Sequence, residues 1–286
     1  MDGVWEELIS LNPRGVGRSG VLGPAAEHRA TDAHPIDWSA EDFEEALVRD
    51  VYPLPTTADR EGYYGPHHFS YWASGHRDWR LLAEAAERLG TQPRDYLDFG
   101  CATGRVLRHA ALDQRTRSVM GCDINRAHTD WIAEHLPQDI VAFQNHSIPT
   151  LPLPDDSLDV VSAYSVFTHI EVFETTWLME LRRVLRPGGI AWVTIQSDLT
   201  WDAIEPGWPV YDGLAPFDDF APYLDERGTL PQPRTVFRYR GDRSYSSHVF
   251  YSRDYVRQVW GRIFDVVEQH HRLPDWQDVV VLQKPR

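Results

Sequence analysis

Residues 96–106 read Tyr96-Leu97-Asp98-Phe99-Gly100-Cys101-Ala102-Thr103-Gly104-Arg105-Val106, a run in which apolar residues give way to small ones. Its first four residues are typical of a short strand, and residues 105–112 have the pattern of a helix. Glycine at positions 100 and 104 permits a tight turn and the close approach of a ligand to the backbone. Because the start of a helix presents free N–H groups to a polar or anionic group, the run predicts a ligand-binding turn.

The spacing of the two glycines restricts the kind of ligand. Gly100 and Gly104 fit neither the dinucleotide pattern G-x-G-x-x-G nor the phosphate-binding pattern G-x-x-x-x-G-K-[ST]. The turn therefore suits an adenosyl amino acid, which has a carboxylate but no pyrophosphate. Asp123 ends the next expected strand, where a carboxylate can accept both ribose hydroxyl protons. Both features lie at the carboxyl ends of strands, where open α/β sheets bind ligands.

Strands and helices alternate on both sides of this turn. Helices are expected over 39–48, with Ser39 as N-cap, and over 77–89, 127–136, 171–185 and 252–264. Strands are expected over 118–123, 140–143, 158–164 and 190–195, followed by a closing hairpin over 266–268 and 278–282. Residues 186–189, Arg-Pro-Gly-Gly, are expected to stop a helix and turn the chain. The alternation predicts βαβ units and a parallel sheet with right-handed crossovers.

Composition narrows the classes of partner. The chain has 286 residues and a formal net charge of -15, which argues against binding a nucleic-acid backbone or an anionic membrane surface. It contains no apolar run of about 18 residues and no basic N-terminal region leading into an apolar run. The two cysteines do not resemble a disulfide framework. We therefore expect a cytoplasmic protein that acts on a small molecule; its oligomeric state stays open.

Five ordered stretches resemble the motifs of the class I S-adenosylmethionine-dependent methyltransferases, in the small-molecule branch called types 11 and 12. They cover residues 97–104, 121–125, 151–161, 165–170 and 181–189. The resemblance implies an α/β, Rossmann-like fold with a seven-stranded, mostly parallel sheet and an antiparallel last strand. It also implies S-adenosyl-L-methionine as cofactor and transfer of its methyl group to a small molecule (EC 2.1.1.-).

The same resemblance assigns roles to the cofactor-binding residues. Asp98 would contact the methionine amino group, Asp123 would bind the ribose hydroxyls, and Ile124 would pack on the adenine. Asn145 and His146 lie where the family contacts the adenine edge. The turn residues that would wrap the methionine and ribose are Phe99, Gly100, Cys101, Ala102, Thr103 and Gly104. The family commonly has glycine in place of Ala102.

Four residues are candidates for the chemistry. By the resemblance, Tyr164 and Ser165 end the fourth strand beside the reactive methyl group. His169 follows that strand and His248 precedes the last helix, and either histidine could be a general base. Each could equally be a packing or capping residue. A nucleophilic Cys101 is disfavoured because it lies in the cofactor turn.

No metal site is expected, because the spacing of the histidines around residues 67–76 matches no strong metal signature. The chain is expected to divide into an N-terminal arm (1–74), a cofactor-binding core (75–197), an inserted and ordered substrate cap (198–250), and a C-terminal helix with strands that complete the core (251–286). The expected activity is methylation of a hydroxyl of a sugar, phenol or secondary metabolite. The alternatives are an enzyme that uses the same cofactor for a cyclisation or rearrangement, and a non-catalytic binding protein.

Overall fold

The computed structural model describes residues 20–286 except 225, 227, 239–246 and 274–275. Part of the expected N-terminal arm, residues 1–19, therefore lies outside the described residues. The chain forms two compact parts, which divide between Ser147 and Ile148. We describe each part by itself.

The first part is built on three parallel strands. β2 (Ser118–Asp123) pairs with β1 (Asp95–Phe99) on one side and with β3 (Val141–Gln144) on the other. Every residue of β1 is buried, as expected of a strand covered on both faces. α4 (Leu107–Ala111) packs on β2, and α5 (Arg126–His135) packs on β2 and β3. These elements confirm the predicted strand–turn–helix alternation.

The N-terminal helices differ from the prediction. α3 (His68–Arg88) begins nine residues earlier than the helix expected from residue 77. Phe69 and Trp72 lie on its buried face, where their rings pack against Phe43. α2 (Glu44–Arg49) begins after the fully buried Phe43, so Ser39 is not its N-cap. Burial of the aromatic rings sets both boundaries, and it outweighs the local capping signal.

The described residues of each part also include two short 3₁₀-helices. In the first part they are η1 (Ala25–Glu27) and η2 (Arg29–Thr31). In the second they are η3 (Ala221–Tyr223) and η5 (Trp260–Arg262).

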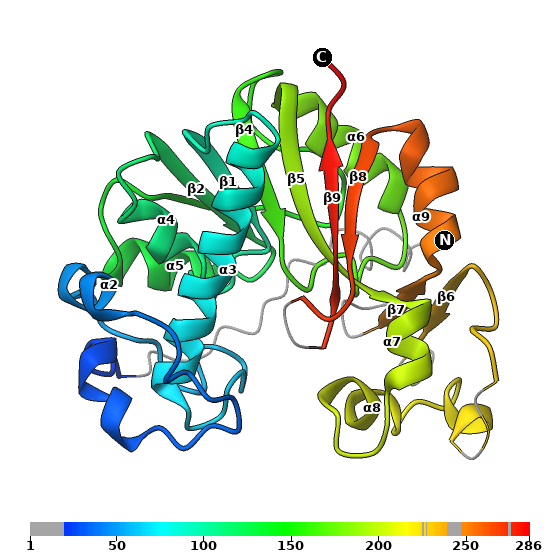
Figure 1. The fold of residues 1–286 in the computed structure, drawn as a ribbon, viewed down its shortest axis with the longest axis horizontal. Helices are drawn as coiled ribbons and strands as arrows, with labels where there is room; N and C mark the ends of the chain where they lie inside the picture. The colour runs from blue at the N-terminus through cyan, green and yellow to red at the C-terminus, as the bar shows by residue number, and fades with distance from the viewer. Residues whose placement is uncertain (1–19, 225, 227, 239–246, 274–275) are drawn as a thin grey trace. The chain divides into compact units, whose positions relative to one another are not determined.

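The second part is built around the long strand β5 (Leu185–Ser197). β4 (Leu158–Ala163) pairs with β5 in parallel, and α6 (Glu174–Val184) connects them. β9 (Asp278–Gln283) lies between β5 and β8 (Asp265–His270) and is antiparallel to both (Figure 1). The predicted antiparallel last strand and closing hairpin are confirmed. Residues 186–189 belong to β5 rather than to a turn, and the β4–β5 register shifts beside them.

Residues 198–251 hold two strands that the sequence did not indicate. β6 (Arg234–Phe237) and β7 (His248–Tyr251) form an antiparallel pair, and β7 continues the sheet in parallel beside the end of β5. The described residues therefore form nine strands rather than seven. Two short helices, α7 (Asp198–Ala203) and α8 (Pro209–Leu214), share a buried aromatic cluster with these strands. The described residues of this segment thus pack around one hydrophobic cluster.

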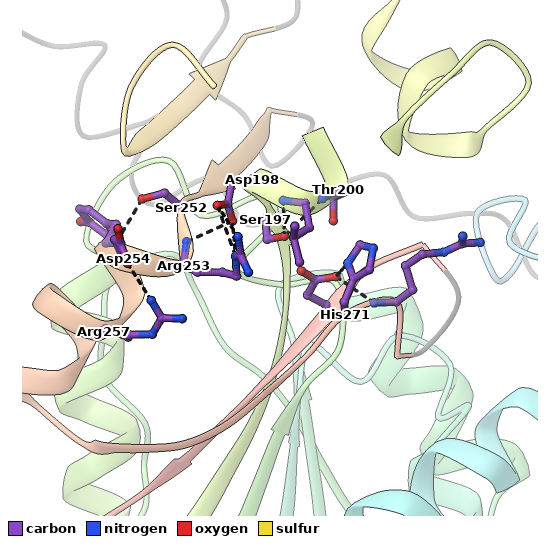
Figure 2. A network of polar contacts seen from close by, with 12 residues as sticks. Ser197, Asp198, Thr200, Ser252, Arg253, Asp254, Arg257 and His271 are labelled. Atoms are coloured by element: carbon purple, nitrogen blue, oxygen red, sulfur yellow. Dashed lines mark hydrogen bonds and ion pairs between the residues drawn. The ribbon is translucent and has the colours of Figure 1, made fainter. Parts of the chain in front are cut away.

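Two serine caps fix the start of the segment and the helix that follows it. Ser197, at the end of β5, accepts hydrogen bonds from the first turn of α7. Ser252, directly after β7, accepts one from Tyr255 N–H and caps α9 (Arg253–Val259). An ion pair of 3.1 Å between Asp198 and Arg253 joins the two helix starts (Figure 2). The predicted cap at Ser252 is confirmed.

Candidate functional site

The cofactor turn is a left-handed stretch that wraps around the end of β2. Gly100, Ala102 and Gly104 have φ values of 79°, 45° and 80°, so alanine at position 102 adopts a conformation that favours glycine. Cys122 O accepts the N–H groups of Gly100 and Cys101 at 2.8 and 3.0 Å. The N–H of Ala102 donates to Asp123 Oδ2 at 2.9 Å. The predicted turn is therefore tied to the predicted ribose acid.

Asp123 retains the capacity to bind a ligand hydroxyl group. Its side chain is almost buried, and Oδ1 accepts the N–H of Asn125 at 2.8 Å while Oδ2 accepts that of Ala102. His128 Nδ1 also lies 3.4 Å from Oδ1, so of about four lone-pair positions at least one stays open. This observation fits the ribose of an adenosyl group.

The residues after β3 carry unsatisfied polar atoms. The N–H of Asn145 donates to Asp123 O at 3.1 Å, which places Asn145 beside the ribose acid. Asn145 Oδ1, His146 Nδ1 and Ser147 Oγ are buried, and none has a hydrogen-bond partner among the described residues. Leaving a buried polar atom unpaired costs about 1–3 kcal/mol. The polar edge of an adenine would satisfy such atoms, so the site fits the adenosyl cofactor.

The other predicted cofactor residues also surround the turn. Asp98 and Phe99 are buried at the end of β1, and Ile124 is half-buried directly after β2. Burial, reinforced by the Asp123 carboxylate, raises the pKa of the Cys101 thiol well above its usual range. Cys101 is therefore protonated at neutral pH, and a role as nucleophile has no support.

Two contacts from the N-terminal arm reach the site, one at the residues after β2 and one at the turn. Sequence reasoning missed both. Glu61 Oε1 accepts a hydrogen bond of 3.0 Å from Asn125 Nδ2, directly after β2. The hydroxyl of Tyr71 lies 3.0 Å from Thr103 Oγ1 in the turn. Both residues lie in the expected N-terminal arm, but no local pattern identified Glu61.

The candidate catalytic residues lie in the second part. β4 ends at Ala163, so Tyr164 and Ser165 directly follow it. Ser165 has a φ of 56°, and its N–H donates to Thr194 Oγ1 at 2.7 Å. The side-chain amide of Gln277 lies 2.8 Å from Ser165 Oγ, which fixes this hydroxyl.

The structure brings His169 and His248 together, with ring centroids 5.5 Å apart. His169 Nδ1 lies 2.8 Å from Ser247 O, and because a carbonyl only accepts, the proton is on Nδ1. His248 Nδ1 lies 3.2 Å from the amide nitrogen of Gln196. Burial, together with repulsion from His169, lowers the pKa of His248 to about 3. His248 is therefore neutral at physiological pH.

Gly213 of α8 and the nearby Phe217 lie against His248. A Cβ atom at Gly213 of α8 would lie 3.3 Å from His248 Nε2, and the ring of Phe217 lies 5.4 Å from the imidazole ring. Gln196 Oε1 is buried and has no hydrogen-bond partner among the described residues. These residues form a partly polar site at the carboxyl end of β5.

In the part of the chain that the structure describes, no three His, Cys, Asp or Glu side chains lie close enough to hold a metal ion. His67, one of the histidines considered in the sequence, pairs with Asp32 at 3.0 Å. No helix among those described combines the length and apolar character needed to cross a membrane.

Replacing Ala102 with glycine is expected to leave the free energy of unfolding unchanged or to raise it by up to about 1 kcal/mol. The left-handed conformation costs alanine about 1–2 kcal/mol, and the greater freedom of unfolded glycine offsets about 0.5–1 kcal/mol of that gain. Thermal unfolding followed by circular dichroism measures the change. The matched control is Ala133→Gly on the exposed face of α5, which is expected to lower stability by about 1 kcal/mol. An equal loss in both variants would show that Ala102 is not strained.

Comparison with known proteins agrees with this geometry. Residues 97–193 match the family described as a methyltransferase domain. The chain is 29% identical over 154 residues to a sterol 24-C-methyltransferase of Gibberella zeae, an alignment that covers 51% of this chain and 40% of that protein. It is 32% identical over 108 residues to a protein of Mycolicibacterium smegmatis named as a probable S-adenosylmethionine-dependent methyltransferase, covering 38% of this chain and 40% of the relative. The chain thus spans less than half the length of these two relatives.

One solved structure shows the likeness of fold. The S-adenosylmethionine-dependent methyltransferase from Mesorhizobium loti superposes with a TM-score of 0.50 at 13% identity, covering 70% of this chain and 96% of that one. Residues 97–193 thus match a methyltransferase domain, and the fold is that of a class I S-adenosylmethionine-dependent methyltransferase. Its cofactor is S-adenosylmethionine.

Proposed function

We propose that the protein transfers a methyl group from S-adenosylmethionine to a hydroxyl group of a small molecule, such as a sugar, phenol or secondary metabolite, in the cytoplasm. One observation carries this proposal. The turn 100–104 is tied to Asp123, next to the unsatisfied polar atoms of residues 145–147. An intact cofactor site of this kind disfavours a non-catalytic binding protein.

When bound, the cofactor supplies an electrophilic methyl group on a sulfonium. The protein's largest contribution is then to align the acceptor with that methyl group, which can lower the barrier by about 7–11 kcal/mol. We propose that Ser165, whose hydroxyl Gln277 holds, and the adjacent Tyr164 contact the acceptor. The segment that packs against His248 would keep water from the acceptor.

We propose His169, rather than His248, as the group that takes the proton from the acceptor hydroxyl. A base works best when its pKa lies near the working pH, and His248 is far too weakly basic for this role. The bond from His169 Nδ1 to Ser247 O makes Nε2 the nitrogen that can accept a proton. A base oriented in this way supports a hydroxyl acceptor, because a hydroxyl must lose its proton on methylation.

The activity is tested with S-adenosylmethionine carrying a labelled methyl group and a panel of sugars, phenols, amines and carboxylic acids. Label recovered in a small-molecule product would support the proposal. Raised thermal stability with S-adenosylhomocysteine, but no methylated product, would favour a non-methylating reaction on the same cofactor. A Tm that neither the cofactor nor its demethylated product changes would contradict both.

The two histidines are compared by His169→Gln and His248→Gln. His169→Gln is expected to lower kcat by about 10²–10⁴-fold and to remove the acidic limb of the pH profile, because the variant lacks the base. His248→Gln is expected to leave the shape of the pH profile unchanged. Initial rates between pH 5 and pH 9 measure both effects. A profile altered only in His248→Gln would assign the base to His248.

A further inference from the structure

The N-terminal arm buries the cationic side chain of Arg60. Arg60 is 1% exposed, and among the described residues it forms no ion pair with a carboxylate. Its Nη2 atom donates to Gly65 O at 2.5 Å and lies 2.8 Å from His68 Nδ1. Nε and Nη1 are buried and have no hydrogen-bond partner among those residues. Two of the three guanidinium nitrogens are therefore unused.

Other enclosed arginines of this part have acidic partners. Arg108 is fully buried and binds both oxygens of Asp50, and Arg105 lies 2.6 Å from Asp78. Burying an ion without such a partner costs several kcal/mol. The ring of Tyr71, 4.9 Å from the Arg60 guanidinium carbon, offsets part of this cost, about 2 kcal/mol. Despite this ring, Nε and Nη1 have no hydrogen-bond acceptor among the described residues.

Asp32, whose negative charge acts on Arg60, is already engaged. Asp32 accepts hydrogen bonds from Ser70 N–H at 2.7 Å and His34 N–H at 2.9 Å, and it contacts His67 Nδ1 at 3.0 Å. Its remaining capacity is therefore small. The described residues thus supply no acceptor to Nε or Nη1 of Arg60, and an anion from a bound ligand would satisfy both.

Arg60 lies close to the cofactor turn. The ring of Tyr71 packs against the guanidinium on one side, and its hydroxyl contacts Thr103 of the turn on the other. The next residue, Glu61, has a left-handed φ of 54° and binds Asn125 beside the ribose acid. Backbone strain of this kind persists where the surrounding contacts over-determine it. Tyr71 thus contacts both the Arg60 guanidinium and the turn.

We propose that Arg60 binds a carboxylate that arrives with a ligand, and that Nε and Nη1 are its donors. Two ligands could bring this group: the amino-acid end of the cofactor, or an acidic acceptor. Both ligands belong to the proposed methyl transfer, so the inference rests on the proposed function. Arg60 lies outside residues 97–193, so the family match does not assign it a role.

The test compares two ligands that share adenosine and sulfur. S-Adenosylhomocysteine has the carboxylate and 5′-methylthioadenosine lacks it, and calorimetry gives both dissociation constants. Arg60→Met is expected to weaken binding of S-adenosylhomocysteine by about 10–100-fold, since hydrogen bonds to charged groups contribute about 1.5–3 kcal/mol. Binding of 5′-methylthioadenosine should change by less than about twofold, because that ligand has no group for Arg60 to bind. The matched control Arg115→Met removes a partly exposed arginine that pairs with Asp113, and it should change neither constant.

The second arm tests an acidic acceptor. With S-adenosylhomocysteine bound, millimolar benzoate or succinate is added to the wild-type protein and to Arg60→Met. A rise in Tm only in the wild type would assign the carboxylate to the acceptor. Arg60→Lys, which keeps the charge, should be intermediate in whichever arm responds.

Removing a buried unpaired charge is not expected to lower the Tm of the ligand-free protein. Equal weakening of both adenosine ligands by Arg60→Met, or no dependence on Arg60 in either arm, would overturn the inference. If Arg60→Met does not fold, Arg60→Lys decides in the same way. A wild-type protein that binds neither adenosine ligand would instead contradict the proposed function.

Discussion

Replacing Asp123 with alanine is expected to weaken binding of S-adenosylhomocysteine by at least about 10²-fold while the protein remains folded. We propose that the carboxylate accepts the ribose hydroxyls, and each hydrogen bond to a charged group contributes about 1.5–3 kcal/mol. The variant also loses the bond of 2.9 Å that ties Ala102 N–H to the end of β2. Isothermal titration calorimetry measures the loss directly.

Two further variants separate these effects. Asp123→Asn keeps the size of the side chain and one acceptor oxygen, and it should bind more tightly than the alanine variant. Asp130→Ala removes an exposed acid of α5 that pairs with Arg126, and it should bind as the wild type does. Unchanged affinity in Asp123→Ala would refute the ribose assignment. A matching loss in Asp130→Ala would trace the effect to overall charge.

Replacing Asp50 with alanine is expected to lower the free energy of unfolding by about 3–5 kcal/mol, because it leaves the Arg108 charge buried and unpaired. Asp50 accepts hydrogen bonds of 2.7 and 2.8 Å from Arg108 and one of 2.7 Å from Trp72 Nε1. It thereby joins the arm to α3 and α4. Urea unfolding followed by circular dichroism measures the change.

The double variant Asp50→Ala/Arg108→Met is expected to recover part of this loss, because it removes the stranded charge. Asp254→Ala breaks an exposed pair with Arg257 and should cost less than about 1 kcal/mol. If Asp50→Ala cost no more stability than Asp254→Ala, burial would not explain the importance of the Asp50–Arg108 pair.

The Asp50–Arg108 pair also makes the stability of the fold depend on pH, in a direction that the pKa of Asp50 sets. Burial opposes ionisation of Asp50, but the Arg108 guanidinium outweighs it and lowers the pKa of Asp50. A carboxyl whose pKa is lower in the folded state stabilises the fold above its unfolded value of about 3.9. That stability is lost as the pH falls through the folded-state pKa.

The sequence correctly predicted the structural features that depend on residues close together in the chain. The strand–turn–helix of residues 96–112 has its whole signal within one short stretch, and so does the cap at Ser252. β6 and β7 were missed because they lie in a stretch of mixed polar and aromatic residues that shows no regular period.

The contacts that complete the cofactor site join distant residues, and no local pattern encodes them. Glu61 binds Asn125 and Tyr71 contacts Thr103, in each case through the fold of the arm. The start of α3 was misplaced for a related reason. Phe69 and Trp72 are helical because their rings pack against Phe43, far away in the sequence. The unpaired state of Arg60 likewise emerges only from the packing of the arm.

The ends of β5 and β7 lie side by side, since Ser197 pairs with Tyr251. The chain between them leaves the end of β5 and returns beside it, between two helix starts that Asp198 and Arg253 join. Lengthening a loop anchored in this way costs little closure entropy. Exchange of this stretch during evolution would therefore cost little stability, and under the proposed function it would change the acceptor while the adenosyl-binding half keeps its sequence.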